Sequence, residues 1–146
     1  MFRSICFLSL LFILLPFGSI NAQKWNAELY SGTSLTFGRK MSKTTPTEQY
    51  VINDDNQVFL STTENESWIY RGKLPKKIVQ KQFRKLKAIR FDFLNINQPG
   101  EQSYFIIYKS EKGKYRNMWS GTAATSIPQN LSNFYDDLWN LAKEVN

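Results

Sequence analysis

Basic side chains gather in one short stretch of this 146-residue chain. Between Arg71 and Arg90 there are nine Lys and Arg residues and no Asp or Glu. The whole chain carries 19 Lys and Arg against 12 Asp and Glu, so this stretch holds more than the entire positive excess. A dense group of ammonium and guanidinium groups attracts anionic ligands and surfaces.

The basic stretch has the pattern of an amphipathic helix that begins near Pro75, a residue suited to the first helical position. Its apolar residues recur at helical spacing and form one stripe, which consists of Ile78, Val79, Phe83, Leu86 and Ile89. The opposite face carries the candidate binding residues Lys76, Lys77, Lys81, Arg84, Lys85 and Lys87. Like charges four residues apart repel each other, so we predict that this face binds an anionic partner. The alternative is an ordinary solvated helix face.

The chain lacks the side chains that most enzymes use for covalent or metal chemistry. It contains no His, and its single Cys is Cys6. These counts exclude Cys–His and Ser–His–Asp nucleophile systems and zinc sites built on Cys and His. The phosphate-binding and dinucleotide-binding glycine motifs are also absent. A carboxylate pair could still act as acid and base, but no spacing marks one. We therefore expect no enzyme activity, no cofactor and no metal.

The first 22 residues predict export from the cytoplasm. Arg3 precedes an apolar run from Ile5 to Phe17, and small or polar residues follow as far as Ala22. This is the pattern of a secretory signal peptide with cleavage after Ala22. The run of about 13 residues is too short for a membrane span, which needs about 20. We expect a periplasmic or secreted protein, and the lack of Cys in residues 23–146 favours a bacterial one.

Residues 23–146 have the length and the pattern of a single α+β domain. Alternating apolar residues and short turns predict a two-layer fold with an antiparallel sheet of about five to six strands and two helices on one face. The order is three to four strands, the basic helix, two strands and a final helix. The expected strands are 25–37, 47–53, 57–63, 68–73, 101–110 and 114–120, with a loop at 38–46 and a turn at 97–100. The final helix begins at Pro128, and its apolar residues recur at helical spacing: Leu131, Phe134, Tyr135, Leu138, Leu141 and Val145.

The order of elements resembles small exported bacterial domains of unknown function, and is similar to the emfourin-type inhibitors of protealysin-like metalloproteases. The residues that carry the resemblance are Tyr30-Ser31-Gly32, Asn53-Asp54, Phe91, Gln98-Pro99-Gly100, Tyr104-Phe105-Ile106, Trp119, Pro128, Leu131, Tyr135 and Leu138. In those inhibitors the N-terminal segment binds the protease. The resemblance therefore implies an inhibitory role for the segment from Tyr30 to Phe37 and nearby loops.

Together these features predict an exported, non-catalytic binding domain. Its partner would be a protein or an anionic envelope or polysaccharide surface that contacts the basic helix face. Export disfavours nucleic acid as the partner, and no transmembrane segment is expected after signal cleavage. The apolar stripe of the helix is needed to cover the sheet, so we do not expect it to enter a membrane. The alternative function is inhibition of a co-exported protease.

Overall fold

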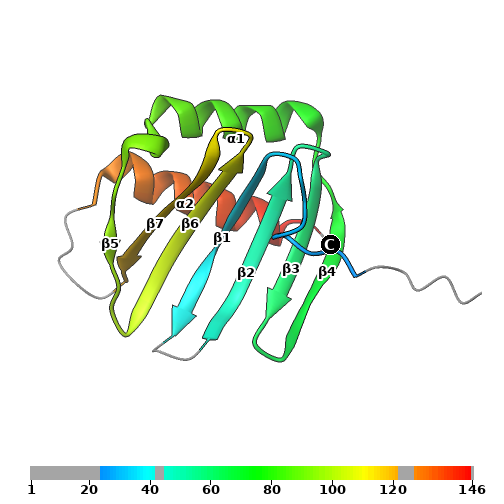
Figure 1. Cartoon of the computed structure of the whole chain (residues 1–146), viewed down its shortest axis with the longest axis horizontal. Coiled ribbons are helices and arrows are strands. Elements are labelled where there is room, and N and C mark those ends of the chain that lie inside the picture. Colours follow the sequence, from blue (N-terminus) through cyan, green and yellow to red (C-terminus); the bar gives the residue numbers. More distant parts are fainter. Residues whose placement is uncertain (1–23, 42–44, 122–126, 146) are drawn as a thin grey trace, which may run out of the picture.

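The computed structural model describes residues 24–41, 45–121 and 127–145, so the expected signal peptide, 1–22, lies outside the described residues. Figure 1 shows one sheet with two helices. The elements are β1 (Ser34–Met41), β2 (Thr45–Asn53), β3 (Gln57–Thr62), β4 (Asn65–Lys73), α1 (Lys76–Ala88), the 3-10 turn η1 (Phe91–Phe93), β5 (Asn97–Gln98), β6 (Gln102–Ser110), β7 (Gly113–Ser120) and α2 (Gln129–Lys143).

The seven strands of the described chain form one sheet in the order β4-β3-β2-β1-β6-β7-β5. All neighbours are antiparallel except β5 and β7, which are parallel. The predicted α+β class with two helices is confirmed. The predicted count of five to six strands was too low, because β5 is a two-residue strand in a stretch that was predicted as a turn.

The boundaries of the first strand differ from the prediction. Residues 24–33 do not belong to the sheet, and β1 continues through Arg39 and Lys40, where a loop was expected. The strand continues because its backbone stays paired on both sides, with Arg39 opposite Glu48 of β2 and Tyr104 of β6, and the Arg39 guanidinium lies 4.8 Å from the ring centre of Trp139. Long basic side chains can cover apolar surface in this way while their charge stays accessible, so polarity alone did not mark a loop.

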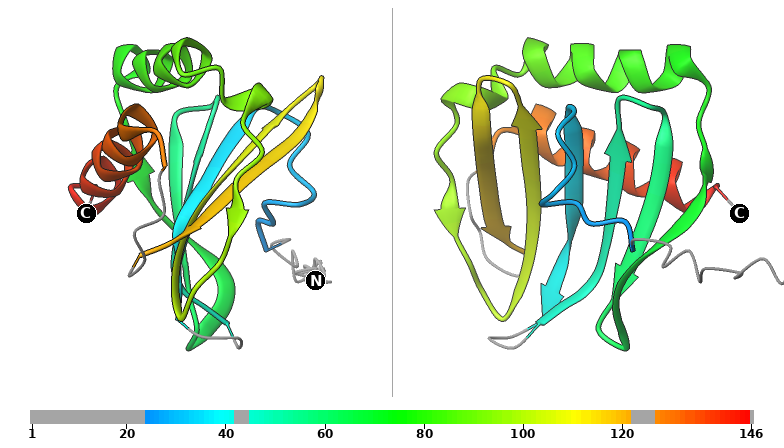
Figure 2. Two further views of the ribbon diagram at one scale, coloured as in Figure 1. Left: turned by 90° about the vertical axis from the view of Figure 1, so that its left-hand side faces the viewer. Right: turned by 45° about the vertical axis from the view of Figure 1, so that its right-hand side comes forward.

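Both helices lie on the same side of the sheet (Figure 2). Helix α2 crosses the strands with Leu131, Phe134 and Leu138 buried, at 0–3% exposure. Helix α1 lies nearer one end of the strands and buries Val79 and Leu86. Both helices contribute to one core, which includes Phe37, Ile52 and Ile106 from the sheet. Of the stripe predicted for α1, Phe83 and Ile89 pack at the edge of this core, whereas Ile78 is not part of it. Burial of these faces is the main force that holds the two layers together.

One buried amide joins the irregular segment after α1 to the sheet. Asn117 on β7 is 0% exposed. Its Oδ1 accepts a hydrogen bond of 2.8 Å from the Ile96 backbone N–H, and its Nδ2 lies 3.5 Å from the Phe91 carbonyl oxygen. Because a buried amide is costly without partners, Asn117 specifies where β5 approaches β7.

The side of the sheet opposite the helices is crossed by the N-terminal strap, which we define as residues 24–33 (Figure 2, left). The indole ring of Trp25 stacks on the ring of Phe59 with centroids 3.8 Å apart. The Tyr30 hydroxyl donates hydrogen bonds to the carboxylates of Asp54 and Asp55 in the β2–β3 turn. The strap is therefore attached at both ends to neighbouring parts of the sheet.

Candidate anion-binding face of helix α1

Helix α1 begins directly after Pro75, as the sequence predicted. The Pro75 carbonyl accepts hydrogen bonds from the backbone N–H groups of Ile78 and Val79, at 2.9 and 3.2 Å. Its first turn has no acidic residue, and its last turn contains Lys85 and Lys87. Cations in the last turn interact favourably with the helix dipole, whereas Lys76 and Lys77 in the first turn do not. The basic residues at the N-terminal end therefore add nothing to helix stability through the dipole.

The structure places five of the six predicted binding residues on the exposed surface of α1. We call this surface the basic face, and it comprises Lys76, Lys77, Lys81, Arg84 and Lys87. Lys85 differs because its side chain is 38% exposed and its Nζ forms an ion pair with Asp137 of α2. The sixth predicted residue thus fastens one helix to the other, and its charge is shared with a carboxylate.

A groove adjoins the C-terminal end of the basic face. It has a volume of about 660 Å³, and Lys87, Arg90, Phe93 and Lys112 are among its lining residues. Phe93 is 72% exposed, and the Arg90 guanidinium lies 4.7 Å from its ring centre. Asp92 and Glu111 also line the groove, so its charge is mixed, unlike that of the basic face.

Of the groove residues, Lys87 belongs to the predicted binding site, whereas Arg90, Phe93 and Lys112 were not predicted to be part of it. Arg90 is the last residue of the basic stretch that begins at Arg71. Its left-handed backbone, with φ of 55°, separates α1 from η1. Lys112 lies in the β6–β7 turn, and only the folded arrangement brings it to the groove. The turn itself was predicted, but no pattern in the sequence indicated that it would lie beside α1.

A second charged cluster lies between the sheet and α2. Glu48 accepts hydrogen bonds of 2.8 Å from both Arg39 and the Tyr50 hydroxyl. Burial alone would raise the pKa of Glu48, but these two hydrogen bonds outweigh it and lower that pKa. Burial and the hydrogen bond to Glu48 raise the pKa of Tyr50 to about 12. The arrangement stabilises an ionised carboxylate, which suits a structural ion pair.

The segment proposed for protease inhibition is divided between two environments. Leu35 and Phe37 lie in the middle of the sheet at 0% exposure. Residues 30–33 belong to the strap and are half-buried or exposed. Inhibitory contact through this segment would therefore be confined to the strap and the neighbouring β2–β3 turn.

Comparison with known proteins adds no family to these observations. No protein-family model matches the chain, and no curated protein matches its sequence. Within residues 24–41, 45–121 and 127–145, no three His, Cys, Asp or Glu side chains converge as metal ligands would. In the same part of the chain, no helix has the length and apolar character needed to cross a membrane. The basic face of α1 remains the candidate site.

Proposed function

We propose that this protein is an exported binding domain that docks on an anionic partner through the basic face of α1. The observation that carries the proposal is the segregation of charge. Five exposed cations share one helix surface, and the sequence from Arg71 to Arg90 supplies no carboxylate to balance them. A solvated helix face ordinarily mixes the two signs, because opposite charges one turn apart are mildly stabilising.

The way in which α1 is held supports this proposal. Val79 and Leu86 are buried at 2% exposure, and Lys85 is paired with Asp137 of α2. The apolar side of the helix is therefore occupied, and the basic face points away from the core on a supported helix. A preorganised array of charges binds with a smaller loss of conformational freedom than a flexible tail does.

The binding strength expected from such a face is moderate and dependent on salt. Each Lys or Arg near an anionic surface contributes about 1 kcal/mol, so five residues together supply up to about 5 kcal/mol. The Debye length falls from about 10 Å at 0.1 M salt to about 3 Å at 1 M. We therefore expect reversible docking that weakens steeply as salt is added.

The partner class follows from the expected export. Outside the cytoplasm, anionic surfaces are offered by phospholipid and lipopolysaccharide headgroups, acidic polysaccharides and acidic proteins. The basic face is convex and belongs to a single helix, so it suits an extended charged surface rather than one small enclosed ligand. Catalysis has no part in this proposal, since the chain has no His and its single Cys lies within the expected signal peptide.

The proposal is tested by co-sedimentation of residues 23–146 with vesicles. Vesicles of phosphatidylglycerol and phosphatidylcholine are compared with vesicles of phosphatidylcholine alone, and a heparin column supplies a polysaccharide arm. We expect retention on at least one anionic probe at 50 mM salt and release near 500 mM. Failure to bind either anionic probe at low salt would contradict the proposal.

A further inference from the structure

Two lysines lie directly opposite each other on the side of the sheet away from the helices. Lys109 on β6 is paired in register with Lys114 on β7. Directly opposed like charges destabilise a β-sheet, and the two strands join through a tight turn that fixes this register. The pair therefore requires negatively polarised atoms from elsewhere.

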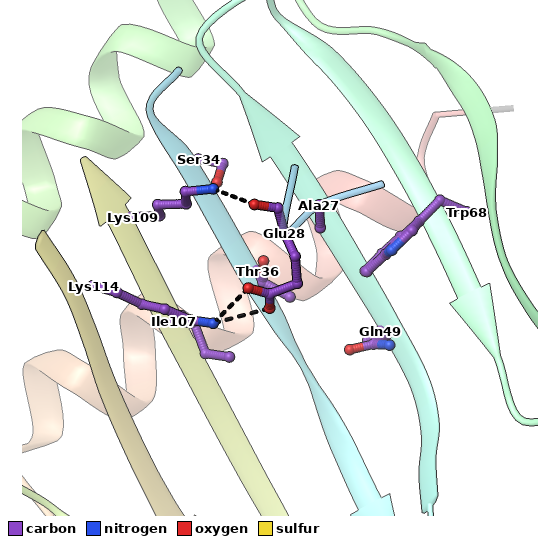
Figure 3. A pocket seen from close by; sticks show the side chains of 9 residues that line it. All are labelled: Ala27, Glu28, Ser34, Thr36, Gln49, Trp68, Ile107, Lys109 and Lys114. Atoms are coloured by element: carbon purple, nitrogen blue, oxygen red, sulfur yellow. Dashed lines mark hydrogen bonds and ion pairs between the residues drawn. The ribbon is translucent and has the colours of Figure 1, made fainter. Parts of the chain in front are cut away.

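The strap supplies those atoms (Figure 3). Both carboxylate oxygens of Glu28 accept hydrogen bonds from the Lys114 Nζ, at 2.9 and 3.0 Å. The Lys109 Nζ donates to the backbone carbonyl oxygens of Glu28 and Tyr30, at 2.8 and 2.6 Å. Two lysines thus recognise one acidic side chain together with two carbonyls of the same short peptide.

The strap occupies this position without entering the core. None of the residues from 24 to 33 is buried, and none belongs to the hydrophobic cluster or its partly buried rim. A cavity of about 200 Å³ lies beside it, lined by Thr36, Gln49, Trp68 and Ile107 of the sheet as well as by Ala27 and Glu28 of the strap. Trp25 is the part of the strap that stacks on Phe59 and meets Trp68 edge to face. A segment held by so few apolar contacts opens at a lower free-energy cost than the core does.

We propose that Lys109 and Lys114 form a binding site for a short acidic peptide folded in a turn, and that the strap fills this site as an internal ligand, since its Asn26 carbonyl accepts hydrogen bonds from the Leu29 and Tyr30 amides. The contacts of the strap specify the chemistry of the occupant. Lys114 takes a carboxylate, Lys109 takes main-chain carbonyls two residues apart, and the cavity beside them accepts a neighbouring side chain against Trp68. A competing acidic segment of another protein would displace the strap and gain the same contacts.

The test uses a full-length mature chain, residues 23–146, in which the strap is weakened by Trp25→Ala and Glu28→Gln. The probe is a fluorescein-labelled peptide with the sequence of residues 25–32, and the control probe carries Gln in place of its Glu. Fluorescence anisotropy should show the weakened variant binding the Glu probe at least tenfold more tightly than wild type does. It should also bind the Glu probe at least tenfold more tightly than the Gln probe.

Two further variants separate this site from the basic face of α1. Adding Lys114→Gln to the weakened variant should abolish the preference for the Glu probe, whereas adding Lys81→Gln should leave it unchanged. Equal binding of the two probes by the weakened variant would overturn the proposal. Loss of the preference for the Glu probe when Lys81→Gln is added to the weakened variant would also overturn it.

Wild-type protein provides a measurement that does not depend on the folding of the variants. A millimolar excess of the unlabelled Glu peptide should accelerate hydrogen exchange at the Leu29 and Tyr30 amides, both of which bond to the Asn26 carbonyl in the strap. The Gln peptide should not do so. Unchanged exchange with the Glu peptide would contradict an exchangeable strap. All these results are independent of vesicle or heparin binding by α1.

Discussion

The ammonium group of Lys85 on α1 forms an ion pair with the carboxylate of Asp137 on α2. The two side chains are 38% and 52% exposed, so solvent screens the pair and its net contribution to stability is small. The ion pair changes the distribution of charge on α1, because Lys85 is the predicted binding residue that faces α2 and Asp137 balances its charge. The five exposed cations of the basic face lie together on the outer surface of the helix.

This pairing predicts that two lysines four residues apart contribute unequally to docking. Lys81→Gln should weaken binding to phosphatidylglycerol vesicles several-fold, because Lys81 is exposed on the basic face. Lys85→Gln should weaken binding less, because its Nζ already engages Asp137. Both variants lose one positive charge, so they control for net charge in the same titration. A greater loss with Lys85→Gln would argue against the assignment of the basic face.

Asn117→Ala should destabilise the protein by about 1–3 kcal/mol, the usual cost of leaving a buried hydrogen-bonding group unpaired. The substitution removes the acceptor of the Ile96 N–H and leaves a space at a residue that is 0% exposed. Urea denaturation followed by circular dichroism measures the change. Asn140→Ala is the control, because Asn140 is exposed on α2. Equal midpoints for the two variants would contradict the structural role of Asn117.

Glu48 should make stability sensitive to acid. Because its pKa is lowered in the folded protein, its contribution is present at neutral pH and is lost as the pH falls below the ordinary value of 4.5. Wild type should therefore have a higher melting temperature than Glu48→Gln at pH 7, and the difference should shrink toward pH 3. Tyr50→Phe, which removes one of the two hydrogen bonds to Glu48, should reduce the acid sensitivity. A difference that stays constant from pH 7 to pH 3 would show that ionisation of Glu48 is not involved.

Periodicity predicted most of the elements because each has one face in the core. The stripe of α1 was identified from Val79 and Leu86, and that of α2 from Leu131 and Leu138, all of which are buried. The β2–β3 and β6–β7 hairpins were likewise marked by turn residues between apolar runs. In each case the local pattern and the tertiary environment agree.

The features that were not predicted depend on contacts between distant parts of the chain. Trp25 follows the alternating pattern of a strand, but its ring stacks on Phe59 outside the sheet. The opposition of Lys109 and Lys114 is a consequence of register, and the Glu28 carboxylate that compensates it comes from more than 80 residues away. Similarly, Asp137 is separated from Lys85 by 52 residues, so no spacing rule could remove Lys85 from the predicted face.

The most direct test of the basic face is a matched comparison of two triple variants. One carries Lys77→Gln, Lys81→Gln and Arg84→Gln on α1. The other carries Lys24→Gln, Lys40→Gln and Arg116→Gln, which lie on the strap, β1 and β7, so both lose three positive charges. At about 1 kcal/mol per residue, the α1 variant should bind phosphatidylglycerol vesicles roughly 100-fold more weakly than wild type at 50 mM salt. The other variant should stay within a few-fold of wild type, whereas equal losses in both would contradict docking through α1.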